Sequence, residues 1–125
     1  MIFTRTTEVG AADRTSLQGT IAISPRALVE TFGRPDQGKE SKISGEYVFV
    51  SNAGSVFTVY DWKLTTRWDE DGMSPERLWD SPEPVVLNVG SRDGESAGDF
   101  TDWLRQQVCP PVRTCGCPCN HILDP

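Results

Sequence analysis

Two stretches rich in β-branched and aromatic residues, 42–51 and 55–63, constrain this chain most. Turn-forming residues at positions 51–54 separate them, Ser-Asn-Ala-Gly in sequence. This arrangement is typical of an antiparallel β-hairpin. If Val50 pairs with Val56, the remaining register follows, with Phe49 opposite Phe57 and Tyr47 opposite Val59. Both faces of the hairpin are then largely apolar, unlike the alternation of a half-solvated antiparallel sheet.

A helix is predicted after a strand at Ser16–Ile23. Ser24 can cap it, and Pro25 suits the first turn, where no amide donor is required. Its apolar stripe consists of Leu28, Val29 and Phe32. Gly33 ends the helix, and the proline at position 35 prevents it from continuing.

The second half of the chain is less regular. Residues 64–83 have weak periodicity, with one helical turn expected at 74–79, and a stretch of this kind often marks a functional loop. A short strand is expected at 84–89 and a turn at 90–94. A second helix is expected at 97–108, with one apolar face formed by Phe100, Trp103, Leu104 and Val108.

The element order β-α-β-β-β-α predicts the fold class, with room for a further strand at the N-terminus. Consecutive strands joined by short loops favour an antiparallel sheet. We expect an α+β fold: a single two-layer domain with about four strands and two helices over residues 1–108. Residues 109–125 form a cysteine-rich C-terminal tail.

Charge and composition exclude several functions. The chain has 125 residues and a net charge of −6, and residues 69–102 hold ten acidic and two basic side chains. This charge disfavours non-specific nucleic-acid binding. No apolar run approaches the length of a membrane helix, and the N-terminus lacks the apolar stretch of a secretory signal. The acidic stretch is either a solvated surface or a patch that meets a basic partner.

Several short motifs suggest a family. They are Ser16–Gly19, Leu28-Val29, Phe32–Pro35, Lys42, Gly45–Tyr47, Val56–Lys63 and Asn88–Gly90. Together they resemble a set of small accessory proteins from tailed bacteriophages and large DNA viruses, over about Ser16 to Leu104. The most specific part is Tyr-Asp-Trp-Lys at positions 60–63, which follows the Gly54 turn. The resemblance implies a viral accessory protein acting in the host cytoplasm against host defence, and it carries over no catalytic residues.

The outer hairpin face is the first candidate site. Tyr60 and Trp62 lie two residues apart there, with Lys42 and Lys63 nearby. Aromatic rings can stack on a base while the lysines neutralise a phosphate. The same rings are alternatively core residues, packed under the long loop or against a second copy in a homo-oligomer.

A second candidate lies at positions 88–92, where Asn88 begins a glycine-containing segment and Arg92 ends it. Backbone amides around Gly90 could accept an anion, with Arg92 as a clamp. The glycine spacing matches neither the dinucleotide fingerprint nor the P-loop, and a plain turn is the alternative.

The tail is a third candidate because it contains thiols and the chain's one histidine. Its ligand set is Cys109, Cys115, Cys117, Cys119 and His121. These residue types suit zinc, although one-residue gaps are unusual for a structural zinc site. Disulfides, a tail with no defined role, and catalysis by Cys119 with His121 are the alternatives.

Three functions follow from these candidates. The first is non-catalytic binding of a small anionic or nucleotide signalling ligand on the hairpin face. The second is inhibition of a host protein through the acidic or aromatic surface. The third is a small metal-dependent hydrolase using carboxylates of the 69–83 loop or a metal bound by the tail. Acid–base catalysis needs a buried carboxylate, whereas Asp99 and Asp102 lie near a predicted helix N-terminus, which argues for exposure, so we expect no enzyme.

Overall fold

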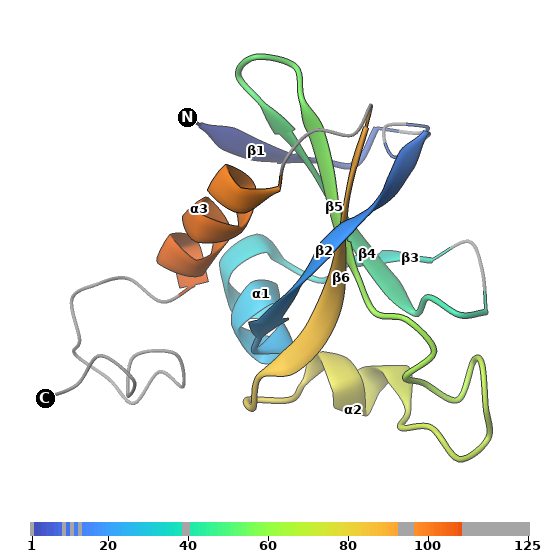
Figure 1. The fold of residues 1–125 in the computed structure, drawn as a ribbon. Coiled ribbons are helices and arrows are strands. Elements are labelled where there is room, and N and C mark those ends of the chain that lie inside the picture. The colour runs from blue at the N-terminus through green and yellow to red at the C-terminus, as the bar shows by residue number, and fades with distance from the viewer. Residues whose placement is uncertain are drawn as a thin grey trace, which may run out of the picture.

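The computed structural model describes residues 2–8, 10, 12, 14–38, 41–92 and 97–108, which form an α+β fold (Figure 1). This part of the chain contains six strands and three helices. The elements are β1 (Phe3–Thr6), β2 (Thr15–Ile23), α1 (Pro25–Phe32), β3 (Asp36–Gln37), β4 (Gly45–Ser51), β5 (Val56–Tyr60), α2 (Pro75–Trp79), β6 (Val85–Arg92) and α3 (Gly98–Val108).

The strands form one open antiparallel sheet in the order β1-β4-β5-β6-β2, and β3 pairs with β4 beside β1. The hairpin register is confirmed, because Val50 lies opposite Val56 and Tyr47 opposite Val59. Gly54 has a φ of 88° at the hairpin turn, a conformation that favours glycine. The meander β4-β5-β6 therefore forms the centre of the sheet, and β2 joins it last along the order.

Helices α1 and α3 lie on the same side of the sheet, and α2 lies near one end of it (Figure 1). The predicted ends of α1 are confirmed. The Ser24 hydroxyl accepts a hydrogen bond from the Ala27 N–H at 3.1 Å, and the Gly33 N–H donates to the Val29 carbonyl at 2.8 Å. A serine also caps α2, where Ser74 accepts from the Arg77 N–H at 3.2 Å.

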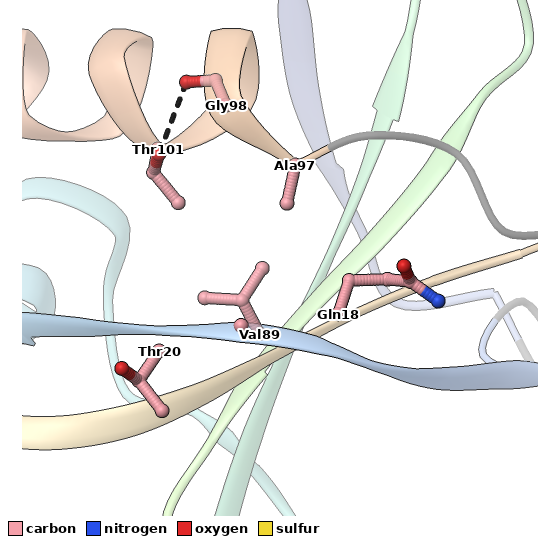
Figure 2. A pocket seen from close by; sticks show the side chains of 7 residues that line it. Gln18, Thr20, Val89, Ala97, Gly98 and Thr101 are labelled. Carbon is pink, nitrogen blue, oxygen red and sulfur yellow. Dashed lines mark hydrogen bonds between the residues drawn. The ribbon is translucent and has the colours of Figure 1, made fainter.

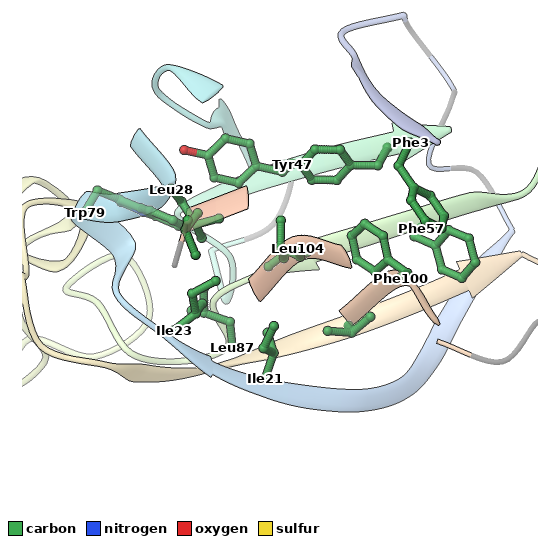
Figure 3. Packing of buried hydrophobic residues seen from close by; sticks show 14 of the residues in the cluster. Phe3, Ile21, Ile23, Leu28, Tyr47, Phe57, Trp79, Leu87, Phe100 and Leu104 are labelled. Atoms are coloured by element: carbon green, nitrogen blue, oxygen red, sulfur yellow. The ribbon is translucent and has the colours of Figure 1, made fainter. Parts of the chain in front are cut away.

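The core lies between the helices and the inner face of the sheet. Phe100 and Leu104 of α3 are fully buried and point toward the strands (Figure 3). The rings of Phe57 and Phe100 stack with their centroids 4.9 Å apart. The cluster also includes Phe3, Ile21, Ile23, Leu28, Tyr47, Phe49, Val59, Leu78, Trp79, Leu87, Val89 and Val108. On the opposite face Val48 and Val56 are also buried, as the apolar pattern of the hairpin predicts.

A polar network closes the end of α1. The Tyr47 hydroxyl donates to the Gly33 carbonyl at 2.6 Å, and Arg5 Nη1 donates to the Phe32 carbonyl at 2.8 Å. Burial raises the pKa of Tyr47 well above its ordinary value, and the nearby Arg5 opposes this shift. A cation near the last carbonyls of a helix is favourable. The hydrogen bonds of Arg5 and Tyr47 therefore join β1 and β4 to the end of α1.

Two expectations about the fold are wrong in detail. The sheet has six strands rather than about four, because β1 and the short β3 both pair with β4. The predicted turn at 90–94 is wrong at positions 90–92, where β6 continues through Arg92. A Cβ atom at Gly90 would lie 2.7 Å from Thr58 Oγ1, so this glycine permits a close approach between strands instead of a turn. In the described part of the chain, no helix is long and apolar enough to cross a membrane.

Candidate functional site

The candidate site begins at a buried carboxylate that follows β5. Asp61 is fully buried, and its carboxylate accepts hydrogen bonds from the N–H groups of Ser44 and Gly45 at 2.8 and 2.9 Å. It also accepts a third from the Ser44 hydroxyl at 2.9 Å. Trp79 Nε1 donates to the same hydroxyl oxygen at 3.0 Å. Asp61 therefore joins the start of β4 to the end of β5 and fixes the residues next to both.

The two predicted lysines, Lys42 and Lys63, lie next to the residues that Asp61 holds. The Lys63 N–H donates to the Lys42 carbonyl at 2.7 Å, so the two backbones lie side by side. Lys63 has a φ of 60°, a left-handed conformation that costs a non-glycine residue about 1–2 kcal/mol. The hydrogen bonds around Asp61 and Lys42 hold this conformation in place.

Two indole rings complete the site. We call Lys42, Trp62, Lys63 and Trp68 the Trp–Lys cluster. The Lys42 ammonium lies 5.5 Å from the Trp62 ring centre and 5.4 Å from that of Trp68. The Lys63 ammonium lies 6.0 Å and 4.8 Å from the same two centres. Each lysine thus contacts both indoles within the range of cation–π attraction.

The cluster is open to solvent. Trp62 is 38% exposed and Trp68 is 44% exposed, whereas Trp79 is 4% exposed. Tyr60, the last residue of β5, packs edge-on against Trp62 with the ring centres 6.3 Å apart. The surface therefore presents two partly exposed indole rings, one phenol ring and two ammonium groups.

Trp68 reaches the cluster through an ordered loop. Its N–H donates to the carbonyl of Thr65 at 3.0 Å, and Thr65 is itself buried. The Arg67 guanidinium donates to the carbonyls of Gly38 and Ile43 at 3.2 and 2.9 Å. Sequence reasoning missed Trp68, although a tryptophan within a charged loop was a signal that could have found it.

The other two predicted ligand residues, Asn88 and Arg92, lie at different distances from the cluster. Asn88 lies opposite Tyr60 in the sheet, so both belong to the same face. Arg92 lies four residues further along β6, about 13 Å away at 3.3 Å per residue. The structure therefore places Asn88 next to the aromatic part of the site and Arg92 away from it. Residues 90–92, around which the anion clamp is predicted, belong to β6 and not to a turn.

The predicted metal ligands lie outside the described residues, whereas the predicted catalytic carboxylates lie within them. The tail candidates Cys109, Cys115, Cys117, Cys119 and His121 lie outside the described residues. Within the described ranges, no group of three or more histidine, cysteine or acidic side chains is placed to hold a metal ion. The carboxylates named for acid–base chemistry are exposed, namely Asp69, Glu70, Asp71, Asp99 and Asp102.

Comparison with other proteins adds no assignment to this geometry. No protein-family model matches the sequence, and a search of curated proteins finds no significant match.

Proposed function

We propose that this protein binds a small anionic ligand with an aromatic base, such as a nucleotide, and does not transform it. The observation that carries this proposal is that the ammonium groups of Lys42 and Lys63 each lie 4.8–6.0 Å from the centres of two exposed rings, those of Trp62 and Trp68. An indole face can stack on a base, and the adjacent ammonium groups can neutralise a phosphate.

The charge of the chain favours a small ligand over a nucleic acid. The protein has a net charge of −6, so a long polyanion would be repelled by most of its surface. A mononucleotide or dinucleotide needs only the two lysines of the cluster. The resemblance to viral accessory proteins supports a host signalling nucleotide, captured in the host cytoplasm as a counter-defence.

Binding without turnover is supported by the acidic groups near the cluster. Both oxygens of Asp61, the nearest buried carboxylate, already accept hydrogen bonds from Ser44 and Gly45. A general base needs a free acceptor within reach of the proton that it removes. Asp61 instead supports the backbone on which the cluster is built.

The test is a thermal-shift and tryptophan-fluorescence titration with cyclic mononucleotides, cyclic dinucleotides and ADP-ribose. A ligand at about 100 times its dissociation constant stabilises its protein by roughly 2.7 kcal/mol. We expect Trp62→Ala to weaken binding by roughly 1–3 kcal/mol, the range for loss of one stacked base. The double variant Lys42→Ala/Lys63→Ala should lose affinity for nucleotides more than for the corresponding nucleosides.

Arg77→Ala is the matched control, because Arg77 is an exposed cation on α2 outside the cluster. It should bind like the wild type. Chromatography of the ligand after long incubation should return it unchanged. Absence of a shift with every nucleotide would contradict the proposal, and chemical conversion of the ligand would contradict its non-catalytic part.

Inhibition of a host protein is the second candidate function, and one observation favours it. Six carboxylates are exposed within the 69–83 loop and α2, namely Asp69, Glu70, Asp71, Glu76, Asp80 and Glu83. A basic partner docked there should dissociate as salt rises, because salt screens exposed charges. A pull-down with an Asp69→Asn/Glu70→Gln/Asp71→Asn variant, compared with Trp62→Ala, separates the two candidates: only the first variant should release such a partner.

A further inference from the structure

The two edges of the sheet differ in their protection. One edge consists of β1 and β3, which are four and two residues long and carry Arg5 and Asp36. The other edge is β2, which has nine residues and neither a charge nor a proline. Short strands, charges, prolines and β-bulges prevent sheet edges from pairing with another chain. Of these devices β2 has only a bulge, between Leu17 and Gly19.

Helix α3 does not cover the β2 edge. A groove of about 440 Å³ separates the two elements, with Val89 at its floor and Ala97 and Thr101 on its helical side (Figure 2). Gly19 lies on the strand side, and a Cβ atom added there would meet no heavy atom within 4 Å. Because β2 is the last strand in the order of the sheet, its outer side has no partner strand among the described residues.

Three exposed residues of β2 lie in one row on the outer face. Leu17, Thr20 and Ala22 lie opposite Gly90, Asn88 and Val86 of β6, at equal intervals along that strand. A bulge between Leu17 and Gly19 keeps Leu17 in this row. Leu17 is 58% exposed, so the row contains a large apolar side chain without cover.

We propose that two copies of this chain form a dimer through their β2 strands. The strands pair antiparallel about a two-fold axis at Thr20. In this register Thr20 faces Thr20 of the second copy, and Leu17 faces its Ala22. The two sheets join into one, and both apolar side chains of each row are covered.

Charge and symmetry favour a second copy as the occupant. Two chains of net charge −6 repel each other over most approaches, but the uncharged β2 edges can meet without opposing like charges. A two-fold interface uses the β2 edge of both copies and leaves only the short charged edges outside. Assembly therefore stops at two.

The dimer is independent of the proposed ligand site. The Trp–Lys cluster follows β5, and β6 lies between β5 and β2 in the sheet. Thr20 and Tyr60 both lie opposite Asn88, on the two sides of β6, so the dimer axis lies two strands away from Tyr60. Failure of nucleotide binding therefore leaves this inference intact, and the reverse also holds.

Sedimentation analysis of the full chain, from micromolar to submillimolar concentration, tests the dimer. The wild type should shift from one to two copies as concentration rises. Thr20→Lys and Thr20→Glu should each weaken association about five-fold or more, because each puts like charges opposite one another at the axis. An equimolar mixture of the two variants should associate more tightly than either alone. Thr20 is exposed, so both variants should keep the wild-type circular dichroism spectrum.

Thr4→Lys is the matched control. Thr4 is an exposed threonine on β1, the protected edge, and its substitution should leave association unchanged. A wild type that stays monomeric throughout the range overturns the proposal. It is also overturned if Thr4→Lys weakens association as much as Thr20→Lys does, or if the mixed variants fail to re-associate.

Discussion

The Asp61 carboxylate accepts two hydrogen bonds from Ser44, one from its backbone N–H at 2.8 Å and one from its hydroxyl at 2.9 Å. This pair joins the end of β5 to the start of β4 at a fully buried position. Lys42 and Trp62, each close in sequence to one member of the pair, are thereby held in contact. The exposed cluster therefore depends on a buried carboxylate that takes no direct part in it.

Substitution of Asp61 should show this dependence. Asp61→Ala leaves the N–H groups of Ser44 and Gly45 without an acceptor in a buried place, which should lower the free energy of unfolding by about 3 kcal/mol or more. Asp61→Asn should cost less, because its amide oxygen can still accept. Urea unfolding measures both changes. Equal losses in the two variants would show that the remaining oxygen does not hold the two N–H groups.

The tryptophans should differ sharply in their effect on stability. Trp62→Ala and Trp68→Ala remove exposed rings and their cation–π contacts, each worth about 0.5–1 kcal/mol, so each variant should lose about 1 kcal/mol. Trp79→Ala removes a buried ring and should lose about 3–5 kcal/mol. Chemical denaturation of the three variants checks this order. A loss at Trp62 as large as that at Trp79 would assign Trp62 to the core.

Tyr47 should make stability depend on alkaline pH. Burial raises the pKa of Tyr47 in the folded protein, while the unfolded chain has a value of about 10. Above about pH 10 the folded state therefore binds more protons than the unfolded state, and stability falls as pH rises. Thermal melts of wild type and Tyr47→Phe across this range should show a steeper fall for the wild type. At neutral pH the two proteins should show the same dependence on pH, because tyrosine stays protonated in the folded and the unfolded state.

A buried hydroxyl on β5 offers a stabilising substitution. Thr58 is fully buried, and its Oγ1 has no hydrogen-bond partner. Thr58→Val replaces this hydroxyl with a methyl group of similar size, so we expect a gain of about 1 kcal/mol in thermal or urea unfolding. Thr65 is the control, since it is equally buried but its hydroxyl accepts from the Arg67 N–H at 3.4 Å. Thr65→Val should not stabilise the protein, and a gain at both positions would point to general hydrophobic burial.

The sequence predicts the fold best where local signals agree. The hairpin register is correct because the turn at 51–54 and the apolar pattern on both sides point to one pairing. Helix α1 is correct because Ser24 and Gly33 mark its two ends. Strand β3 was missed because a two-residue pairing such as Asp36 with Glu46 depends on contacts distant in sequence. The turn predicted from Gly90 was wrong because that glycine serves a contact with Thr58, which local pattern does not reveal.

In the candidate site, too, the sequence predicts what local signals determine and misses what depends on distant contacts. Lys42, Trp62 and Lys63 were found because the hairpin places the ends of its two strands together. Trp68 was missed because the loop that holds it has no period, and its position depends on hydrogen bonds made by Arg67 and Thr65. The sequence assigns Arg92 to a second candidate because it predicts a turn at 90–94, whereas β6 continues through Arg92.

The pairing of β2 with β6 also bears on how the chain is made. Thr15 meets Arg92 and Ile23 meets Val85, so β2 has no neighbour in the sheet until nearly all of the described chain has left the ribosome. Contacts so distant in sequence slow folding, because a long loop must close before they form. During synthesis, β2 therefore has both of its sides unpaired while the β4–β5 hairpin can already form locally. The risk that β2 pairs with another chain is therefore greatest before β6 has left the ribosome.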